Sequence, residues 1–430
     1  MLLFPAFVQG IVILSIRPPI LQILINMKCW SVQLRGGASP VVDDSDVDWA
    51  TVEMPEFPNE QEQTSFFSEK RVAITISIVS AILIISSVTI AGVGLYQFLY
   101  QNAEKSGPPS DLLDWQDDFR TLTGLDNVSA TGTGVSVCVV DTGIDLTHSD
   151  FVGKDLTGWK DFINDQETPY DDQGHGTAMA GLIWANDWMK GVSPGADLYV
   201  AKAMSSDGEG VDETIAAAVD WCVDSGVDVI SLSLGGAAGF NYFLSSTDSL
   251  ENSVDSAISS GVFVVAAAGN DGENDDGDVS SPGSVEDVIC VGGVDSAGSI
   301  WVGSSEGDNN GRFFPLPPIM PRSDPDKKPE VTGPGEDVPI LIPLNLVEDG
   351  FLPWGYASGT SAATAWISGG IALLLEEKPE LQRDGSSGGS NAISDVKQWI
   401  SESSSGQESH DSHYGYGILN AEELISVANS

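Results

Sequence analysis

The chain has 430 residues, of which 63 are acidic and 18 are basic, so its formal net charge at pH 7 is −45. A field of this sign repels the phosphates of nucleic acids and of anionic lipids, which argues against nucleic acid as a partner. Salt screens such repulsion over ~10 Å at 0.1 M. The acidic excess therefore suggests a saline habitat, such as that of a halophilic or marine microbe, and an ordinary acidic secreted surface is the alternative.

Residues 1–42 form an apolar segment whose role the sequence leaves open. An arginine and two prolines at positions 17–19 interrupt the hydrophobic run. The segment is either a second membrane segment or sequence that precedes a later start at Met27 or Met54. Residues 43–71 are acidic and lack sustained periodicity, which predicts a disordered tail.

Residues 72–100 contain no charge and exceed the ~20 residues that a bilayer-spanning helix needs. We expect an uncleaved transmembrane signal anchor, because a cleaved signal peptide has a shorter apolar run and lies nearer the N-terminus. Lys70 and Arg71 immediately precede the run. The positive-inside tendency therefore places the N-terminus in the cytoplasm and the rest of the chain outside, after a linker at 101–110.

The remainder, residues 111–430, is expected to form one α/β domain. Short runs rich in valine and isoleucine alternate with stretches of helical character, which predicts a mainly parallel sheet. The expected strands are 135–140, 197–203, 227–234, 261–267 and 287–293, and the expected crossover helices are Asp212–Cys222 and Ser249–Ile258.

Three segments, VVDTGID, GHGTAMAG and SGTSAAT, carry Asp141, His175 and Ser361. Asp141 follows a β-rich run, His175 lies between two glycines, and Ser361 precedes an apolar helix whose positive end would face a reacting oxygen. A serine hydroxyl is a poor nucleophile until a neutral imidazole takes its proton, and a carboxylate must orient that imidazole. These three residues are therefore predicted to form a catalytic triad.

The three segments resemble those of the subtilisin-like serine proteases, the subtilases, and the resemblance extends from about Asp111 to the C-terminus. Further segments resemble the family in family order: GVSPGADLYVAKAM, VDVISLSLGG, GVFVVAAAGNDG, SPGSVEDVICVGGVD, KPEVTGPGEDV and HYGYGILNAEELI. The resemblance implies a three-layer subtilisin-like fold with a mainly parallel central sheet. It also implies catalysis that requires no cofactor.

The resemblance assigns further site residues. Asn270 corresponds to the side-chain donor of the oxyanion hole, paired with the backbone N–H of Ser361. Substrate is expected to bind along Ser233, Leu234, Gly235, Gly236, Ala268 and Gly269. The chain departs from the family at Ala362–Ala365, where Met-Ala-Pro-His is usual, and at Ala178, where a second histidine is common. Neither change removes a catalytic group.

The cysteines and the acidic loops suggest little further chemistry. Cys138 and Cys290 lie in expected core strands and are predicted to be buried thiols, since the four cysteines give little evidence of a disulfide framework. The loops 271–278 and 306–310 are rich in oxygen ligands, and each is either a solvated acidic loop or a structural calcium site. No metal is expected to take part in catalysis.

The sequence thus predicts a single-pass membrane serine endopeptidase whose catalytic domain is extracytoplasmic. It would hydrolyse peptide bonds of polypeptides through an acyl-enzyme intermediate. The alternative is a catalytically silent, membrane-anchored peptide-binding protein on the same scaffold. A third reading is a processing protease that acts on one partner's leader rather than on bulk polypeptide.

Overall fold

The computed structural model describes most of the chain from residue 60 onward. The described residues are 60–104, 107–234, 249–272, 278–307, 310, 321–348 and 350–430, with side chains of the first helix described for 70–95. The predictions for residues 1–59 lie outside them. The chain divides into two compact units, Met1–Val88 and Thr89–Ser430.

Helix α2 (Glu60–Glu104) contains the apolar stretch. Its segment Lys70–Leu95 has 26 residues and a mean hydropathy of 2.4, and its most apolar part is not buried by the rest of the chain. At 1.5 Å per residue it is about 39 Å long, more than the ~30 Å of a bilayer's hydrocarbon core. Its length and composition are thus sufficient for one membrane span.

Helix α2 also corrects one prediction. It begins at Glu60, so residues 60–71, which we expected to belong to a disordered tail, are helical. The reason is local, because the stretch begins with Glu-Gln-Glu-Gln, and these residues extend a neighbouring helix at little cost in free energy.

The α/β domain is built on a nine-stranded sheet within the described residues, in the order β10-β11-β7-β6-β5-β4-β1-β3-β2. Every neighbouring pair is parallel except β10 with β11, so the expected mainly parallel sheet is confirmed. The strands are β1 (Ser136–Asp141), β2 (Gly158–Asp161), β3 (Asp197–Lys202), β4 (Val229–Leu232), β5 (Phe263–Ala267), β6 (Ile289–Val294), β7 (Val331–Pro334), β10 (Ser405–Asp411) and β11 (Gly415–Ile418). A separate antiparallel pair consists of β8 (Val338–Leu341) and β9 (Trp354–Ala357).

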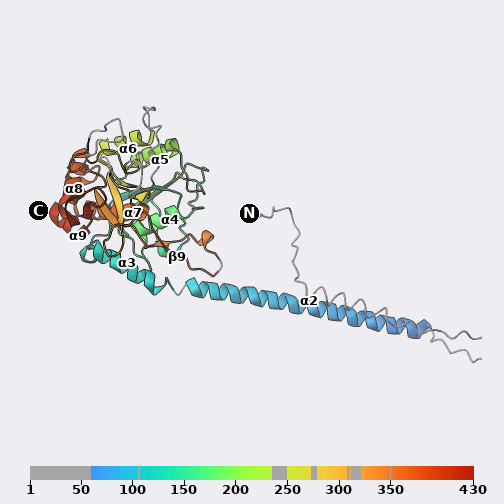
Figure 1. Ribbon diagram of the computed structural model, residues 1–430. Coiled ribbons are helices and arrows are strands. Elements are labelled where there is room, and N and C mark those ends of the chain that lie inside the picture. The colour runs from blue at the N-terminus through green and yellow to red at the C-terminus, as the bar shows by residue number, and fades with distance from the viewer. Residues whose placement is uncertain are drawn as a thin grey trace, which may run out of the picture. The chain divides into compact units, whose positions relative to one another are not determined.

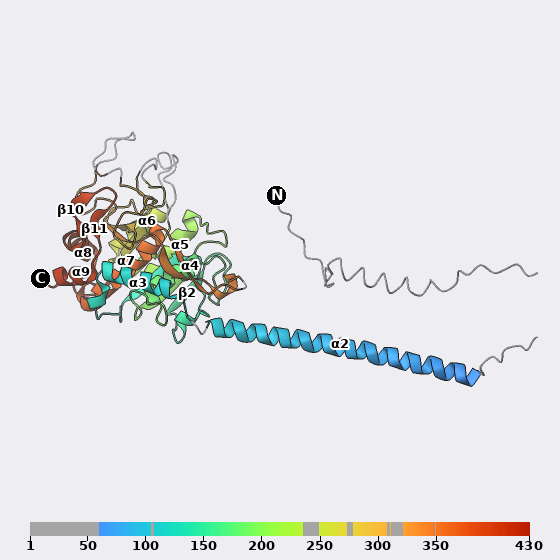
Figure 2. The ribbon, with the colours of Figure 1, turned by 60° about the horizontal axis from the view of Figure 1, so that its bottom comes forward.

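Helices cover the sheet in two groups. They are α3 (Ser110–Leu122), α4 (His175–Trp184), α5 (Asp212–Asp224), α6 (Ser249–Ser259), α7 (Thr360–Glu377), α8 (Ser390–Ser403) and α9 (Ala421–Ala428). Helix α7 packs on α4 and crosses β4 to β7, whereas α5 and α6 pack together over β1, β3 and β5. Figure 1 shows α5 and α6 at the top of the domain and α3 at its bottom, and in Figure 2, where the bottom is turned towards the viewer, α3 lies at the front.

The central strands form because their residues are buried on both faces. In β4 and β5 every residue is buried, as expected for parallel strands covered by helices. In α7 the run from Ala362 to Leu375 is also buried, which makes this helix the centre of the core. The core therefore holds the strand ends and the start of α7 in fixed positions.

A disulfide bond corrects a second prediction. Cys138 of β1, which we expected to be a free thiol, is bonded to Cys222 of α5, with the two Cα atoms 6.0 Å apart. Both residues are fully buried, whereas Cys290 remains a buried free thiol, as predicted. The pairing was not evident because the two cysteines are 84 residues apart and meet only when α5 packs on β1.

Candidate active site

The predicted catalytic residues lie where strands end and helices begin. Asp141 is the last residue of β1, His175 is the first residue of α4, and Ser361 is the second residue of α7. In open α/β sheets ligands bind outside the carboxyl ends of the strands. The fold thus brings the three segments to the part of the sheet where a site is expected.

Asp141 and His175 form a close pair. Nδ1 of His175 lies 2.8 Å from Oδ1 and 2.9 Å from Oδ2 of Asp141. The carboxylate is fully buried, and the imidazole is 30 % exposed. The backbone N–H of Thr142 donates to Oδ1 at 2.7 Å and holds the carboxylate in place. A carboxylate on Nδ1 favours the tautomer with its proton there, which leaves Nε2 free to accept one.

Asp171 is a positioning residue that the sequence interpretation missed. Its carboxylate is buried and accepts five hydrogen bonds, from Thr142 Oγ1, from the backbone of Gln173 and Gly174, and from the N–H and Oγ1 of Thr177. It therefore satisfies the N–H of Thr177 in the first turn of α4 and the N–H groups of Gln173 and Gly174 before the helix, and so fixes the turn that presents His175. The signal in the sequence is an acidic residue just before a helix.

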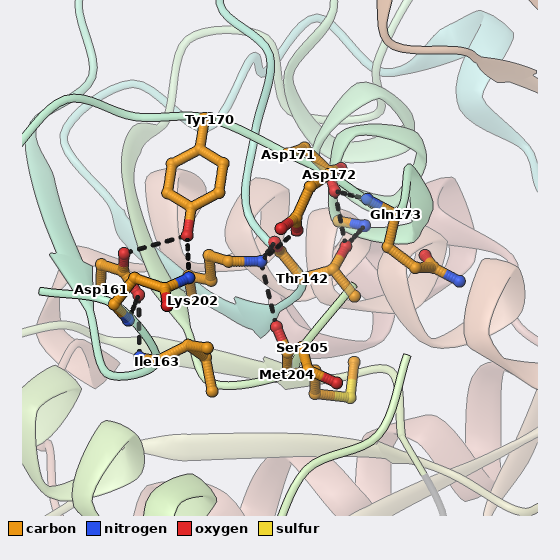
Figure 3. Close-up of polar contacts among 12 residues, drawn as sticks. Thr142, Asp161, Ile163, Tyr170, Asp171, Asp172, Gln173, Lys202, Met204 and Ser205 are labelled. Atoms are coloured by element: carbon orange, nitrogen blue, oxygen red, sulfur yellow. Dashed lines mark hydrogen bonds and ion pairs between the residues drawn. The ribbon is translucent and has the colours of Figure 1, made fainter. Parts of the chain in front are cut away.

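Lys202, the last residue of β3, is hydrogen-bonded to the same turn through its side chain. Its side chain is fully buried, and its Nζ donates to Asp172 Oδ1 at 2.7 Å, to Thr142 O at 2.5 Å and to Met204 O at 3.1 Å. Figure 3 shows these contacts converging on the ammonium group, with the ring of Tyr170 alongside. Because all three N–H groups have partners, this buried charge is compensated.

Ser361 is hydrogen-bonded to Ser233. Its hydroxyl donates to the backbone carbonyl of Ser233 at 3.0 Å, and the hydroxyl of Ser233 donates to the carbonyl of Ser361 at 3.0 Å. Within the described residues, no hydrogen bond joins Ser361 Oγ to His175. The structure thus places Asp141 with His175 and Ser361 with Ser233, and leaves these two pairs unconnected.

Asn270 faces the start of α7. Its Oδ1 accepts hydrogen bonds of 3.0 Å from both the N–H and the hydroxyl of Thr360, which leaves Nδ2 free of these contacts. A methyl group placed on Gly359 would lie 3.7 Å from Asn270 Nδ2 and 3.8 Å from the backbone N of Ser361. The side-chain amide of Asn270 and the backbone N of Ser361 therefore lie close together beside Gly359.

Of the six expected substrate-binding residues, the structure describes four. Ser233 and Leu234 follow β4, and Leu234 packs partly against the core. Gly269 has φ +111 and lies against the hydroxyls of two serines, so only glycine fits there. The side chain of Ala268 is fully buried, so only its backbone can face a ligand. The remaining predictions, Gly235 and Gly236, lie outside the described residues.

The electrostatics of the pair bear on the protonation of His175. Burial alone would lower the pKa of the imidazole, but the charge and hydrogen bond of Asp141, with a smaller effect from Asp171, raise it above its ordinary value. Asp141 therefore stabilises the imidazolium form of His175.

The two predicted oxygen-rich loops are described only in part. Residues 273–277 and 308–309 lie outside the described residues. Elsewhere in the described part of the chain, no group of three or more histidine, cysteine, aspartate and glutamate side chains is arranged to hold a metal ion. Calcium at these loops stays a prediction.

The chain is similar to known serine proteases. The model of the Subtilase family matches residues 132–417. Serine protease AprX of Bacillus subtilis (strain 168) is 33% identical over 315 residues, which cover 69% of this chain and 67% of AprX. Subtilisin DY of Bacillus licheniformis is 31% identical over 309 residues, which cover 70% of this chain and 95% of that protein. A crystal structure of a cold adapted subtilisin-like serine proteinase shares the fold at TM-score 0.53 and 24% identity, over 69% of this chain and 91% of the other.

The parallel sheet and the acid–imidazole pair, taken with these relatives, define a serine peptidase, a hydrolase of peptide bonds. More narrowly, the chain belongs to the subtilase family, with a subtilisin-like α/β fold. The expected subtilisin-like α/β fold with a mainly parallel sheet and the expected enzyme class are confirmed.

Proposed function

We propose that the protein is a membrane-anchored endopeptidase that cleaves polypeptides through an acyl-enzyme on Ser361. The observation that carries the proposal is the contact of His175 Nδ1 with both oxygens of the buried Asp141. This contact leaves Nε2 as the base, and Asp141 stabilises the imidazolium formed when the serine is deprotonated.

The proposed reaction requires the Ser361 hydroxyl to leave the carbonyl of Ser233 and to reach His175 Nε2. We assign this movement to a rotation about χ1 of Ser361 between staggered rotamers. Such hydrogen bonds are often long or misaligned before substrate binds. The hydroxyl then loses its proton to His175 and attacks the carbonyl, and His175 returns the proton to the leaving amine.

The oxyanion is assigned to the space beside Gly359. Asn270 Nδ2 and the backbone N–H of Ser361 flank that space, and the N-terminus of α7 adds the positive end of its dipole. The segment Ser233–Gly236, with Ala268 and Gly269, would hold extended substrate on the acyl side through its backbone.

Covalent labelling tests the assignment. A fluorophosphonate should modify the wild type and leave Ser361→Ala unlabelled, because it reacts only with an activated serine. Ser368→Ala is the matched control, since its hydroxyl lies further along α7 and donates to Thr364 O. Peptide binding without labelling of the wild type would contradict catalysis and favour a silent binding protein.

The pH dependence provides a first prediction. Because the pKa of His175 is raised above 6.5, the imidazolium persists to higher pH than in free histidine. The neutral base is therefore lost as pH falls through a value above 6.5, and kcat/KM should fall with it. A profile of kcat/KM against pH checks this, and a flat profile down to pH 4 would contradict the role of His175.

Loss of the Asn270 side chain provides a second prediction. Asn270→Ala should lower kcat by roughly 10²–10³ with little change in KM, because this donor acts mainly on the developing oxyanion. Asn270→Asp keeps the acceptor for Thr360 but places a negative charge beside the oxyanion, so its kcat should be at least as low. Unchanged kcat in both variants would remove Asn270 from the site.

The proposed extracytoplasmic location of the peptidase domain is supported by the candidate membrane span and by the disulfide bond. The apolar segment Lys70–Leu95 supports a single-pass anchor, and Lys70 and Arg71 support a cytoplasmic N-terminus. The Cys138–Cys222 bond supports a non-reducing compartment for the peptidase domain, residues 111–430. Protease added to sealed cells should digest this domain, and its protection would reverse the proposed orientation.

The charge of the chain leads to a third prediction. With a net charge of −45, the folded protein should be destabilised by self-repulsion at low ionic strength. If the protein belongs to a saline habitat, peptidase activity should rise between low and molar salt. A flat response would favour an ordinary acidic secreted surface.

A further inference from the structure

A short segment that packs against the turn before His175 has no part in the site described so far. It is the 3₁₀ helix η5 (Leu344–Leu346), which lies between β8 and β9. A methyl group placed on Gly174 would lie 3.2 Å from Cδ1 of Leu346 and 3.4 Å from Pro343. Gly174 immediately precedes the catalytic histidine, so η5 lies beside its backbone.

Helix η5 is fixed to both loops that present the catalytic pair. The side chain of Asn345 donates to the carbonyl of Asp171 at 3.0 Å, on the loop that leads to His175. The backbone N–H of Leu344 donates to Asp145 Oδ2 at 2.8 Å, on the loop that follows Asp141. A segment held in this way is preorganised, so little conformational entropy is lost when a ligand contacts it.

Leu346 is an apolar side chain in this segment that is available to a ligand. It is 39 % exposed although it is apolar, and glycine at position 174 leaves room for it. Gly174 has φ +105, a conformation that a residue with a side chain rarely adopts. An exposed leucine on a rigid segment beside a catalytic base is suited to contact an apolar group of a substrate.

The chemistry indicates which part of the substrate this is. In the proposed mechanism the acyl part of the substrate lies on the side of Ser233, which is hydrogen-bonded to Ser361, and of Asn270, which is hydrogen-bonded to the neighbouring Thr360. The imidazolium of His175 hands its proton to the leaving amine, so the chain after the scissile bond must lie on the histidine's side. Leu346 lies on that side, through its contact at Gly174.

We propose that Leu346 determines specificity on the leaving-group side, where it favours an apolar side chain following the scissile bond. This inference rests on the proposed acyl-enzyme mechanism. The amine that leaves when Ser361 is acylated and an added amine that attacks the acyl-enzyme occupy the same position, because the second step is the reverse of the first. When an amine attacks, the Ser361 ester C–O bond breaks and an amide C–N bond forms. A proton from the amine passes through His175 to Ser361 Oγ.

Partition of the acyl-enzyme between water and added amines tests the inference. A peptide ester acylates the full-length enzyme, and leucinamide or glycinamide then competes with water for deacylation. The ratio of the two amide products is independent of the acylation rate. Leucinamide should be preferred by roughly tenfold, as expected for a partly buried apolar side chain.

Two variants and a control make the result specific. Leu346→Ser should lose most of the preference for leucinamide, and Leu346→Glu should gain a preference for argininamide, which misfolding cannot produce. Val211→Ser is the control, because Val211 is also an exposed apolar residue and belongs to a different element, as the N-cap of α5. This control should retain the wild-type ratio.

The outcomes separate the two proposals. If the variants keep the wild-type ratio while the ester is still hydrolysed, the role of Leu346 is wrong and the peptidase proposal stands. If the wild type forms no acyl-enzyme, as judged by fluorophosphonate labelling of Ser361, the peptidase proposal fails and this inference fails with it.

Discussion

Asp141→Asn is expected to lower kcat for peptide hydrolysis by about 10⁴-fold with the fold intact. Both oxygens of Asp141 face Nδ1 of His175, so an amide in their place would put an N–H donor opposite a ring nitrogen. The imidazole would then favour the other tautomer, with its proton on Nε2, where the base is needed. Steady-state rates on a peptide amide, with circular dichroism to verify folding, measure this loss.

The same variant should also change the pH profile of the residual activity, which would not change if Asp141 had a purely structural role. The carboxylate raises the pKa of His175 against the opposing effect of burial. Without that charge the pKa should fall, so the acid limb of the residual activity should shift to lower pH. Asp220→Asn, on the exposed side of α5, is the matched control. If both variants kept wild-type kcat and acid limb, Asp141 would have no catalytic role.

The sequence predicted the central sheet because its strands are continuous apolar runs. Strands β1 (SVCVVD) and β5 (FVVAA) are buried on both faces, so they stand out as apolar stretches without alternation. Strand β4 (VISL) is equally buried, although Ser231 interrupts its apolar run. Strand β10, SGQESHD, is different, because it has no apolar residue and most of its side chains are exposed. Its pairing with β11 depends on backbone hydrogen bonds, which leave no pattern in the sequence.

The site was predictable where chemistry and local structure coincide. Asp141 ends an apolar strand, and His175 and Ser361 begin helices, so each had two signals in the sequence. Asp171 and Lys202 had none of comparable strength, since acidic residues are abundant in this chain and a lysine in a strand is usually exposed. Their importance comes from burial beside the catalytic loop, a property of the folded chain.

The disulfide is the other feature that only the folded chain reveals, and removing it should cost stability. Cys138→Ala with Cys222→Ala should lower the free energy of unfolding by about 4.5 kcal/mol, because the bond closes a long loop in the unfolded chain. The sequence separation of 84 residues sets that magnitude. Urea unfolding followed by tryptophan fluorescence measures it, and Cys290→Ala, which removes a buried thiol outside the bond, is the matched control.

Thiol titration tests the Cys138–Cys222 bond without a measurement of stability. In a Cys29→Ser background three cysteines remain of the original four. If Cys138 and Cys222 are bonded, the chain denatured without reductant exposes a single thiol, that of Cys290, and all three only after reduction. Three thiols before reduction would show that the bond is absent. The double alanine variant should then lose only about the 1 kcal/mol typical of point mutations, and the extracytoplasmic location would lose the support of the disulfide.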